Sequence, residues 1–120
     1  MASSQAVSVV TLQEILDAFN RHDLDAIMAH YGPDVILTSR VAARLLSDPS
    51  GTVTGREALR IYFQRGLEAY PNLAFELVDV MWGLSSVVLC YVNQKGTHTA
   101  EFMEFDTSMK VIRVSANYNG

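Results

Sequence analysis

The sequence predicts a single α+β domain, with its helices early in the chain and most of its sheet late. Before residue 71, apolar residues recur at three- and four-residue steps, which is typical of helices that bury one face. After residue 71, short turns separate four strand-like runs, at 73–82, 85–93, 97–106 and 110–118. Turns this short require antiparallel neighbours, and helices followed by strands indicate α+β rather than alternating α/β architecture.

The first helix is predicted at about residues 8–21, where the apolar positions are Val9, Leu12, Ile15, Leu16 and Phe19. Asp23 is then placed to cap a short second helix, which Gly32-Pro33 would end. We expect the inner face of this second helix to carry Leu24, Ile27, Met28 and Tyr31.

A strand is predicted from Asp34 to Ser39, followed by an insert, 41–51, whose centre can form one or two helical turns. Thr54 and Glu57 have the spacing of a capping box, in which each side chain satisfies a backbone N–H at a helix start. This motif predicts a third helix from residue 54 to Pro71, which cannot extend a helix.

The run Val87–Val92 is apolar at both strand parities, so we expect both faces of this strand to be covered. Only one layer of helices is available for the sheet. The second face therefore requires either a sheet that curls on itself or a second copy of the chain, and we expect a homodimer through the sheet.

Composition and charge exclude several classes of protein. The 120 residues suit one domain, 1–120, in which we expect residues 1–7 to be flexible, and 49% apolar residues exclude a disordered chain. The net charge of −4, with no basic cluster, argues against a nucleic-acid partner. The absence of a long apolar window or a signal peptide argues against a membrane and for the cytoplasm. Cys90 is alone and no Cys/His metal spacing occurs, so we expect no metal and no cofactor.

Four segments resemble a known superfamily: Phe19-Asn-Arg-His-Asp-Leu-Asp-Ala-Ile27, His30-Tyr-Gly-Pro-Asp34, Thr54-Gly-Arg-Glu-Ala-Leu59 and Gly96-Thr-His-Thr99. In this order they resemble the nuclear transport factor 2-like superfamily, and within it the SnoaL-like polyketide cyclases and the ketosteroid isomerases. The resemblance implies a cone-shaped, bent sheet wrapped around three helices (a cystatin-like α+β barrel), a closed-ended pocket and dimerisation through the sheet. The superfamily hosts many functions, so function must be argued from the pocket.

The resemblance also implies roles for particular positions. In ketosteroid isomerases the general-base aspartate falls at Ser39 of this chain, the oxyanion-hole tyrosine at Ile15 and the protonated acid at Glu101. Two of these three roles are lost, which disfavours steroid isomerisation. The acid/base aspartate of the SnoaL-like cyclases also matches Glu101, which makes Glu101 the candidate catalytic residue.

The strand pattern supports the same residue. Glu101 shares parity with Thr97, Thr99, Met103 and Phe105, a face that is otherwise small, polar or apolar. If this face lines a pocket, desolvation raises the carboxyl pKa and suits the group to acid/base work near neutral pH. The alternative is a glutamate on a solvated face or one satisfied by the backbone.

Other side chains are candidates for binding a substrate or for structure alone. Candidate pocket residues, each of which could instead be core or interface, are Tyr31, Ser39, Tyr62, Trp82, Met103 and Asn117, with Tyr91 and Tyr118 as further amphipathic side chains. His98 has the opposite parity to Glu101 and fits the surface better than catalysis, and His30 fits a helix end. Asp79 could face inward or pair with Arg113.

Two hypotheses of function remain. The first is an enzyme without a cofactor, of isomerase, cyclase or lyase type, in which Glu101 moves a proton on a hydrophobic small molecule. The second is a non-catalytic module for ligand binding or dimerisation, which explains the absence of a clear second catalytic group.

Overall fold

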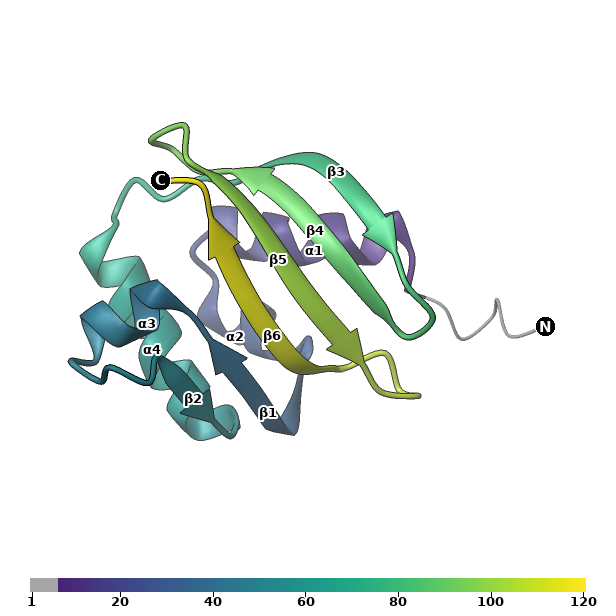
Figure 1. Ribbon diagram of the computed structural model, residues 1–120, viewed down its shortest axis with the longest axis horizontal. Helices are drawn as coiled ribbons and strands as arrows, with labels where there is room; N and C mark the ends of the chain where they lie inside the picture. The colour runs from purple at the N-terminus through teal and green to yellow at the C-terminus, as the bar shows by residue number, and fades with distance from the viewer. Residues whose placement is uncertain (1–6) are drawn as a thin grey trace.

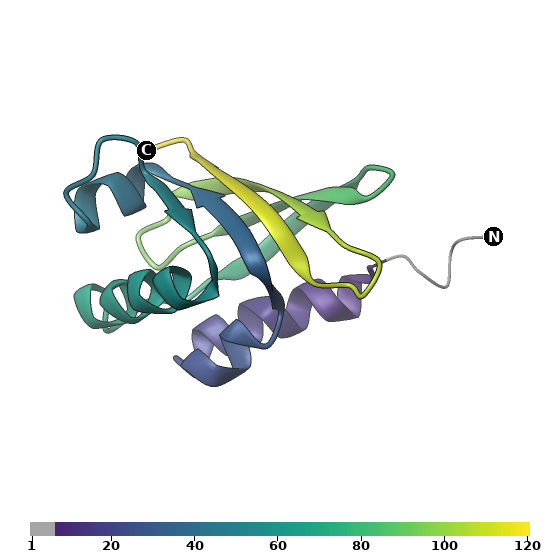
Figure 2. The same cartoon turned by 90° about the horizontal axis from the view of Figure 1, so that it is seen from below.

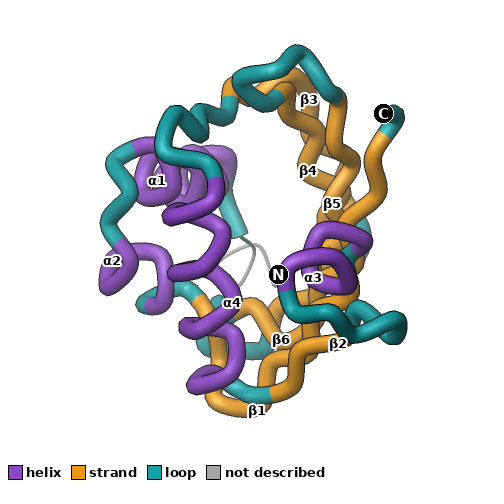
Figure 3. Tube along the Cα trace, turned by 90° about the vertical axis from the view of Figure 1, so that its left-hand side faces the viewer, coloured by secondary structure: helices purple, strands orange, loops and turns teal. Residues whose placement is uncertain are grey.

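A six-stranded sheet curves over three of the four helices in the computed structural model, which describes residues 7–120 (Figure 1). Figure 2 shows these helices on one side of the sheet, and Figure 3 shows the strands bending around them. The opposite face of the sheet carries no helix within the described residues (Figure 1). The predicted α+β class and bent sheet are confirmed. The flexible segment expected at residues 1–7 lies outside the described residues except for Val7, which packs against the core.

The first two helices follow the sequence signals. Helix α1, Val9–Asn20, is capped by the Ser8 side chain, which accepts a hydrogen bond from the Thr11 N–H at 3.2 Å. Helix α2, Leu24–Met28, is capped by Asp23 in the same way through the N–H of Ala26 at 3.1 Å.

Tyr31 is not on the second helix, contrary to the prediction from helical spacing. It is the first residue of strand β1, Tyr31–Thr38, and pairs in parallel with Val111 of strand β6, Val111–Tyr118. The Val111 N–H donates to the His30 carbonyl at 2.9 Å, and α2 has already ended at Met28, four residues before Gly32.

The capping box predicted at Thr54 and Glu57 is also wrong. Thr54 ends a short strand that the sequence did not reveal, β2, Thr52–Thr54, where it pairs with Ile36. Helix α4, Arg56–Ala69, instead has Gly55 at its N-cap and no side-chain cap. The φ of +91° at Gly55 is open to glycine and strained for other residues.

The remaining elements match their predicted positions within a few residues. The helical turns of the insert are helix α3, Arg40–Leu45, and the late strands are β3, Glu76–Trp82, β4, Ser86–Val92, and β5, His98–Phe105. The strand order is β2-β1-β6-β5-β4-β3, and every pairing is antiparallel except β1 with β6.

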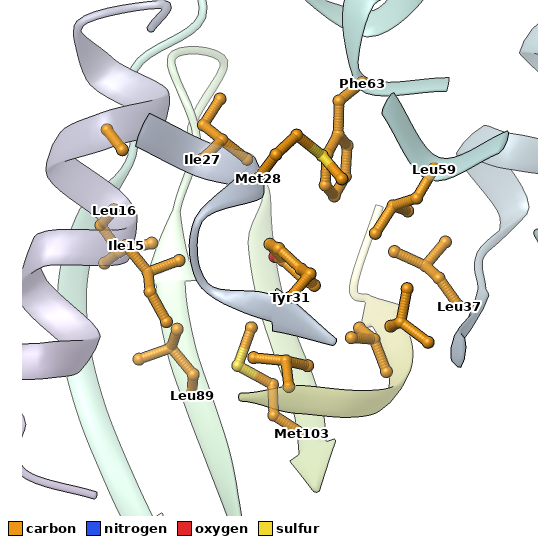
Figure 4. Packing of buried hydrophobic residues seen from close by; sticks show 14 of the residues in the cluster. Ile15, Leu16, Ile27, Met28, Tyr31, Leu37, Leu59, Phe63, Leu89 and Met103 are labelled. Atoms are coloured by element: carbon orange, nitrogen blue, oxygen red, sulfur yellow. The ribbon is translucent and has the colours of Figure 1, made fainter. Parts of the chain in front are cut away.

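The core lies between the helices and the concave face of the sheet (Figure 4). Leu12, Ile15 and Leu16 of α1 and Leu59 of α4 are fully buried in it. The sheet contributes Val35, Leu89, Met103, Val111 and Val114 from four different strands. These buried side chains fill one end of the space under the sheet. No helix within residues 7–120 is long and apolar enough to cross a membrane.

Candidate active site

A cavity of about 400 Å³ lies at the end of the sheet where α3, α4 and the β4–β5 loop meet. Its walls are mostly apolar and aromatic, and they include Phe19, Leu37, Phe63, Leu67 and Phe75. Pairs of aromatic rings support this wall, with Phe19 and Phe63 edge to face at 5.1 Å between ring centroids. The volume suits a small molecule of several rings or a medium chain.

Glu101 projects into this cavity from the concave face of β5. Its neighbours in register are Leu89 of β4 and Ala116 of β6, and the buried side chains of Thr99 and Met103 flank it on the same face. Among residues 7–120 Glu101 is the one carboxyl side chain that lines the cavity, and no lysine or arginine forms an ion pair with it. It is half-buried, and its open side faces the cavity.

Burial raises the pKa of Glu101 from 4.5 to about 7. The Tyr91 hydroxyl, which donates to Oε1 at 3.4 Å, opposes this rise weakly because it stabilises the charged form. A carboxyl with a pKa near 7 holds its proton in about half of the molecules at neutral pH. It can therefore both accept and donate a proton under the same conditions.

Tyrosine hydroxyls supply further polar atoms of the cavity. Desolvation raises the pKa values of Tyr62, Tyr91 and Tyr118, so all three keep their protons at neutral pH and can donate hydrogen bonds. The Tyr118 hydroxyl lies 2.9 Å from Ser39 Oγ, which also accepts the Val41 N–H at 3.0 Å. Ser39 thus serves as the N-cap of α3 and anchors Tyr118 at the cavity wall.

The predicted site residues fall into three groups. Glu101, Ser39 and Tyr62 line the cavity together. Met103 and Tyr31 belong to the packed core beneath it, where the Tyr31 and Phe63 rings lie 5.4 Å apart between centroids (Figure 4).

Trp82 and Asn117 lie away from the cavity. Trp82 ends β3 at the far end of the sheet from α3 and is 53% exposed. Asn117 is exposed, and its amide donates to the carbonyls of Ala100 and Ser115. An amphipathic side chain does not by itself predict a place in the cavity. The parity and position of a residue along its strand decide whether its side chain reaches the concave face.

The remaining polar candidates have structural environments. His98 is exposed at the start of β5, and burial lowers the pKa of His30, which does not line the cavity. Asp79 is exposed on β3, and Arg113 pairs with Glu104 at 3.1 Å, so the predicted alternative of an Asp79–Arg113 pair is wrong. Cys90 is half-buried on the convex face of β4.

Sequence reasoning missed the basic side chains at the cavity mouth, Arg40, Arg44 and Lys95. The sequence predicts no functional role for Arg40 and Arg44. The two arginines are four residues apart on a short helix and therefore lie on one face of it. This spacing is the sequence feature that could have indicated a shared site. Within residues 7–120, no group of three or more His, Cys, Asp or Glu side chains is arranged to hold a metal ion.

The bent sheet, the helices beneath it and the cavity at one end together make a cone-shaped α+β fold. This is the nuclear transport factor 2-like fold. The SnoaL-like domain family matches residues 12–116, and the chain belongs to this family. No curated protein matches the sequence.

Solved structures share the fold over nearly the whole chain. A SnoaL-like protein of unknown function from Burkholderia thailandensis E264 is 30% identical, with a TM-score of 0.86, covering 96% of this chain and 100% of its own. A candidate polyketide cyclase from Sinorhizobium meliloti is 11% identical, with a TM-score of 0.74 and coverage of 88% and 92%. A candidate ketosteroid isomerase from Kribbella flavida is 17% identical, with a TM-score of 0.71 and coverage of 91% and 75%. The last two likenesses show the fold alone.

Proposed function

We propose that this protein is a cofactor-free enzyme that moves a proton on a carbonyl-bearing or cyclic, largely hydrophobic small molecule, with Glu101 as the acid/base. The observation that carries the proposal is a carboxyl without a cationic partner, aimed into an apolar cavity, whose pKa of about 7 lets it exchange a proton at neutral pH. The candidate cyclase and isomerase among the structural neighbours agree with this class of chemistry.

The cavity supports a two-part mechanism. The Glu101 carboxylate takes a proton from the carbon beside the substrate carbonyl, and the electron pair of the C–H bond moves onto the carbonyl oxygen. The hydroxyl of Tyr62 or Tyr118 donates a hydrogen bond to the oxygen that gains charge. The Glu101 carboxylic acid then returns the proton to another carbon in an isomerase. In a cyclase the enolate carbon attacks a second carbonyl carbon, and the alkoxide that results takes the proton.

A non-catalytic ligand-binding module is the second candidate. It is favoured because, among residues 7–120, no histidine and no second carboxyl side chain lines the cavity beside Glu101. In this case Glu101 holds a ligand by hydrogen bonding, and an amide could replace it.

Deuterium exchange at carbon distinguishes the two candidates. We would incubate 2-tetralone, a bicyclic ketone with acidic protons beside its carbonyl, with the protein in D₂O and follow exchange by NMR. Under the enzyme proposal the protein accelerates exchange, and Glu101→Gln lowers the acceleration roughly a hundredfold or more. Glu104→Gln, on the opposite face of the same strand, is the matched control and keeps it. Binding of 2-tetralone without accelerated exchange, or equal exchange by wild type and Glu101→Gln, supports the binding module instead.

We also propose that two copies of the chain associate through the convex face of the sheet. On this face Val88 and Cys90 of β4 lie opposite Phe102 and Ala100 of β5, and Met81 of β3 lies beside Val88. Met81 is 58% exposed and the others are half-buried, so the strands present apolar surface where no described helix covers them. A second copy would bury this surface.

A further inference from the structure

The mouth of the cavity carries positive charge that no acidic side chain within residues 7–120 neutralises. Arg40 and Arg44 of α3 and Lys95 of the β4–β5 loop line the mouth from two sides. The ion pairs within residues 7–120 are Arg21–Asp23, Arg60–Asp25 and Arg113–Glu104, and none of them includes a mouth residue.

Two of the mouth cations, Arg44 and Lys95, are held by the neutral side chain of Tyr70. Arg44 donates to the Tyr70 hydroxyl, and the Lys95 ammonium lies 5.4 Å from the centre of the same ring. Arg40 lies 5.4 Å from the centre of the Tyr118 ring and donates to the backbone oxygen of Gly120 at 2.6 Å. The ring and hydroxyl of Tyr70 orient Arg44 and Lys95 but leave their charge uncompensated.

The positive charge acts inside the cavity as well as at its edge. Arg40 and Arg44 lower the pKa of Tyr118, against the larger upward effect of desolvation, so their field reaches a side chain that lines the wall. An arginine keeps several N–H donors after one hydrogen bond, and Arg44 uses one on Tyr70. Donors therefore remain for a ligand that enters between Tyr70 and Tyr118.

We propose that the ligand of this cavity carries an anionic group, a carboxylate or a phosphate, which Arg44 and Lys95 bind at the mouth with Arg40 beside them. The inference rests on the proposed function, which places the reacting group of the ligand at Glu101. It adds the chemical class of the ligand. Thr97, which lines the cavity beside the loop of Lys95, and Glu101 are four residues apart on extended chain. At about 3.3 Å per residue, the backbones of these two residues are separated by roughly 13 Å. A ligand that contacts both the mouth and Glu101 is therefore better matched by a fused-ring or medium-chain acid than by a small keto acid.

Two fluorescent probes that differ by one charge test the proposal. 8-Anilinonaphthalene-1-sulfonate is an anion, and N-phenyl-1-naphthylamine is the same molecule without the sulfonate. We expect the double variant Arg44→Gln/Lys95→Gln to bind the anionic probe roughly tenfold more weakly and the neutral probe within twofold of wild type. Arg65→Gln removes a charge from an exposed position of α4 outside the cavity and should change neither affinity. Lys95→Gln alone, in an exposed loop, gives a smaller loss of the same kind without a risk to folding.

Three results would overturn the proposal. One is an equal loss of both probes, which would show that the side chains shape the cavity rather than bind charge. Another is no change in the affinity for the anionic probe. The third is amide NMR shifts that place the anionic probe on the convex face, at Val88 and Phe102, rather than at Thr97 and Thr99.

Competition against the anionic probe identifies the source of the negative charge. Dodecanoate and dodecyl phosphate should both displace it at lower concentration than dodecan-1-ol, and the stronger of the two indicates a carboxylate or a phosphate ligand. Equal displacement by all three overturns the proposal. Glu101→Gln should keep the preference for the anionic probe, so a failure of anion binding and a failure of proton transfer at Glu101 are separate results.

Discussion

Replacing Glu101 by glutamine perturbs the electrostatics of the cavity without changing its shape, and its effect on stability requires no substrate. The buried carboxyl has a pKa of about 7 in the folded protein and an ordinary value of 4.5. Between these two pH values the folded state holds a proton that the unfolded chain has released. The free energy of unfolding therefore falls as the pH rises from about 4.5 to about 7.

The size of this loss follows from the two pKa values. At about 1.4 kcal/mol for each pKa unit, the difference between 7 and 4.5 corresponds to about 3 kcal/mol, lost in full above pH 7. Glutamine stays neutral at every pH, and its amide oxygen can still accept the Tyr91 hydroxyl. Relative to wild type, Glu101→Gln should therefore gain about 3 kcal/mol of stability between pH 4.5 and pH 8.

Urea unfolding followed by circular dichroism at pH 4.5, 6, 7 and 8 measures the difference between the two proteins. Burial also lowers the pKa of His30, which makes stability rise with pH in the acid range, but His30 is present in both proteins and cancels. Glu68→Gln, which removes the same charge from an exposed position of α4, is the control and should show no such pH-dependent gain. A difference between wild type and Glu101→Gln that does not vary with pH would refute the reasoning.

Two further predictions concern the helix cap and the convex face. Gly55→Ala should cost about 1–2 kcal/mol in the free energy of unfolding because of its φ of +91°, whereas Thr54→Ala, exposed in β2, should cost less than about 0.5 kcal/mol by the same urea assay. A larger loss of stability in Thr54→Ala than in Gly55→Ala would support the capping box instead. Sedimentation at tens of micromolar protein should show a wild-type dimer and a Phe102→Glu monomer, with Thr107→Glu, in the β5–β6 turn, as a dimeric control. A monomeric wild type would contradict the proposed association.

Local patterns predicted those elements whose residues also have local partners. Helix α1 has its cap at Ser8 and its apolar stripe within twelve residues, and the antiparallel strands β3 to β6 are joined by short turns. The predictions were wrong where a segment distant in the sequence pairs with the residues concerned. Tyr31 pairs with Val111, eighty residues away, and the backbone of Thr54 pairs with Ile36, so strand pairing overrides a helical spacing and a capping motif.

The inner end of the cavity could be predicted from a local pattern, whereas its mouth could not. Strand parity alone placed Glu101 on the face of Met103, because alternation along one strand is a local property. The mouth instead joins Arg44 of one helix, Tyr70 at the end of another and Lys95 of a hairpin loop, and no pattern within any one segment indicates that they meet. Only the packing of α3 against α4 and the path of the β4–β5 loop bring them together.

The charges at the two ends of the cavity are separated, and this separation decides what a ligand can do there. The pKa of Glu101 depends on burial and on the Tyr91 hydroxyl, whereas the arginines of the mouth act on Tyr118. If the cations lay close to Glu101, they would lower its pKa and hold it as a carboxylate, which could accept a proton but rarely return one. Because they lie at the mouth, an anionic group can be bound there while Glu101 keeps its proton affinity near neutral pH. The cavity is thus arranged to bind with one end of a molecule and to move a proton at the other.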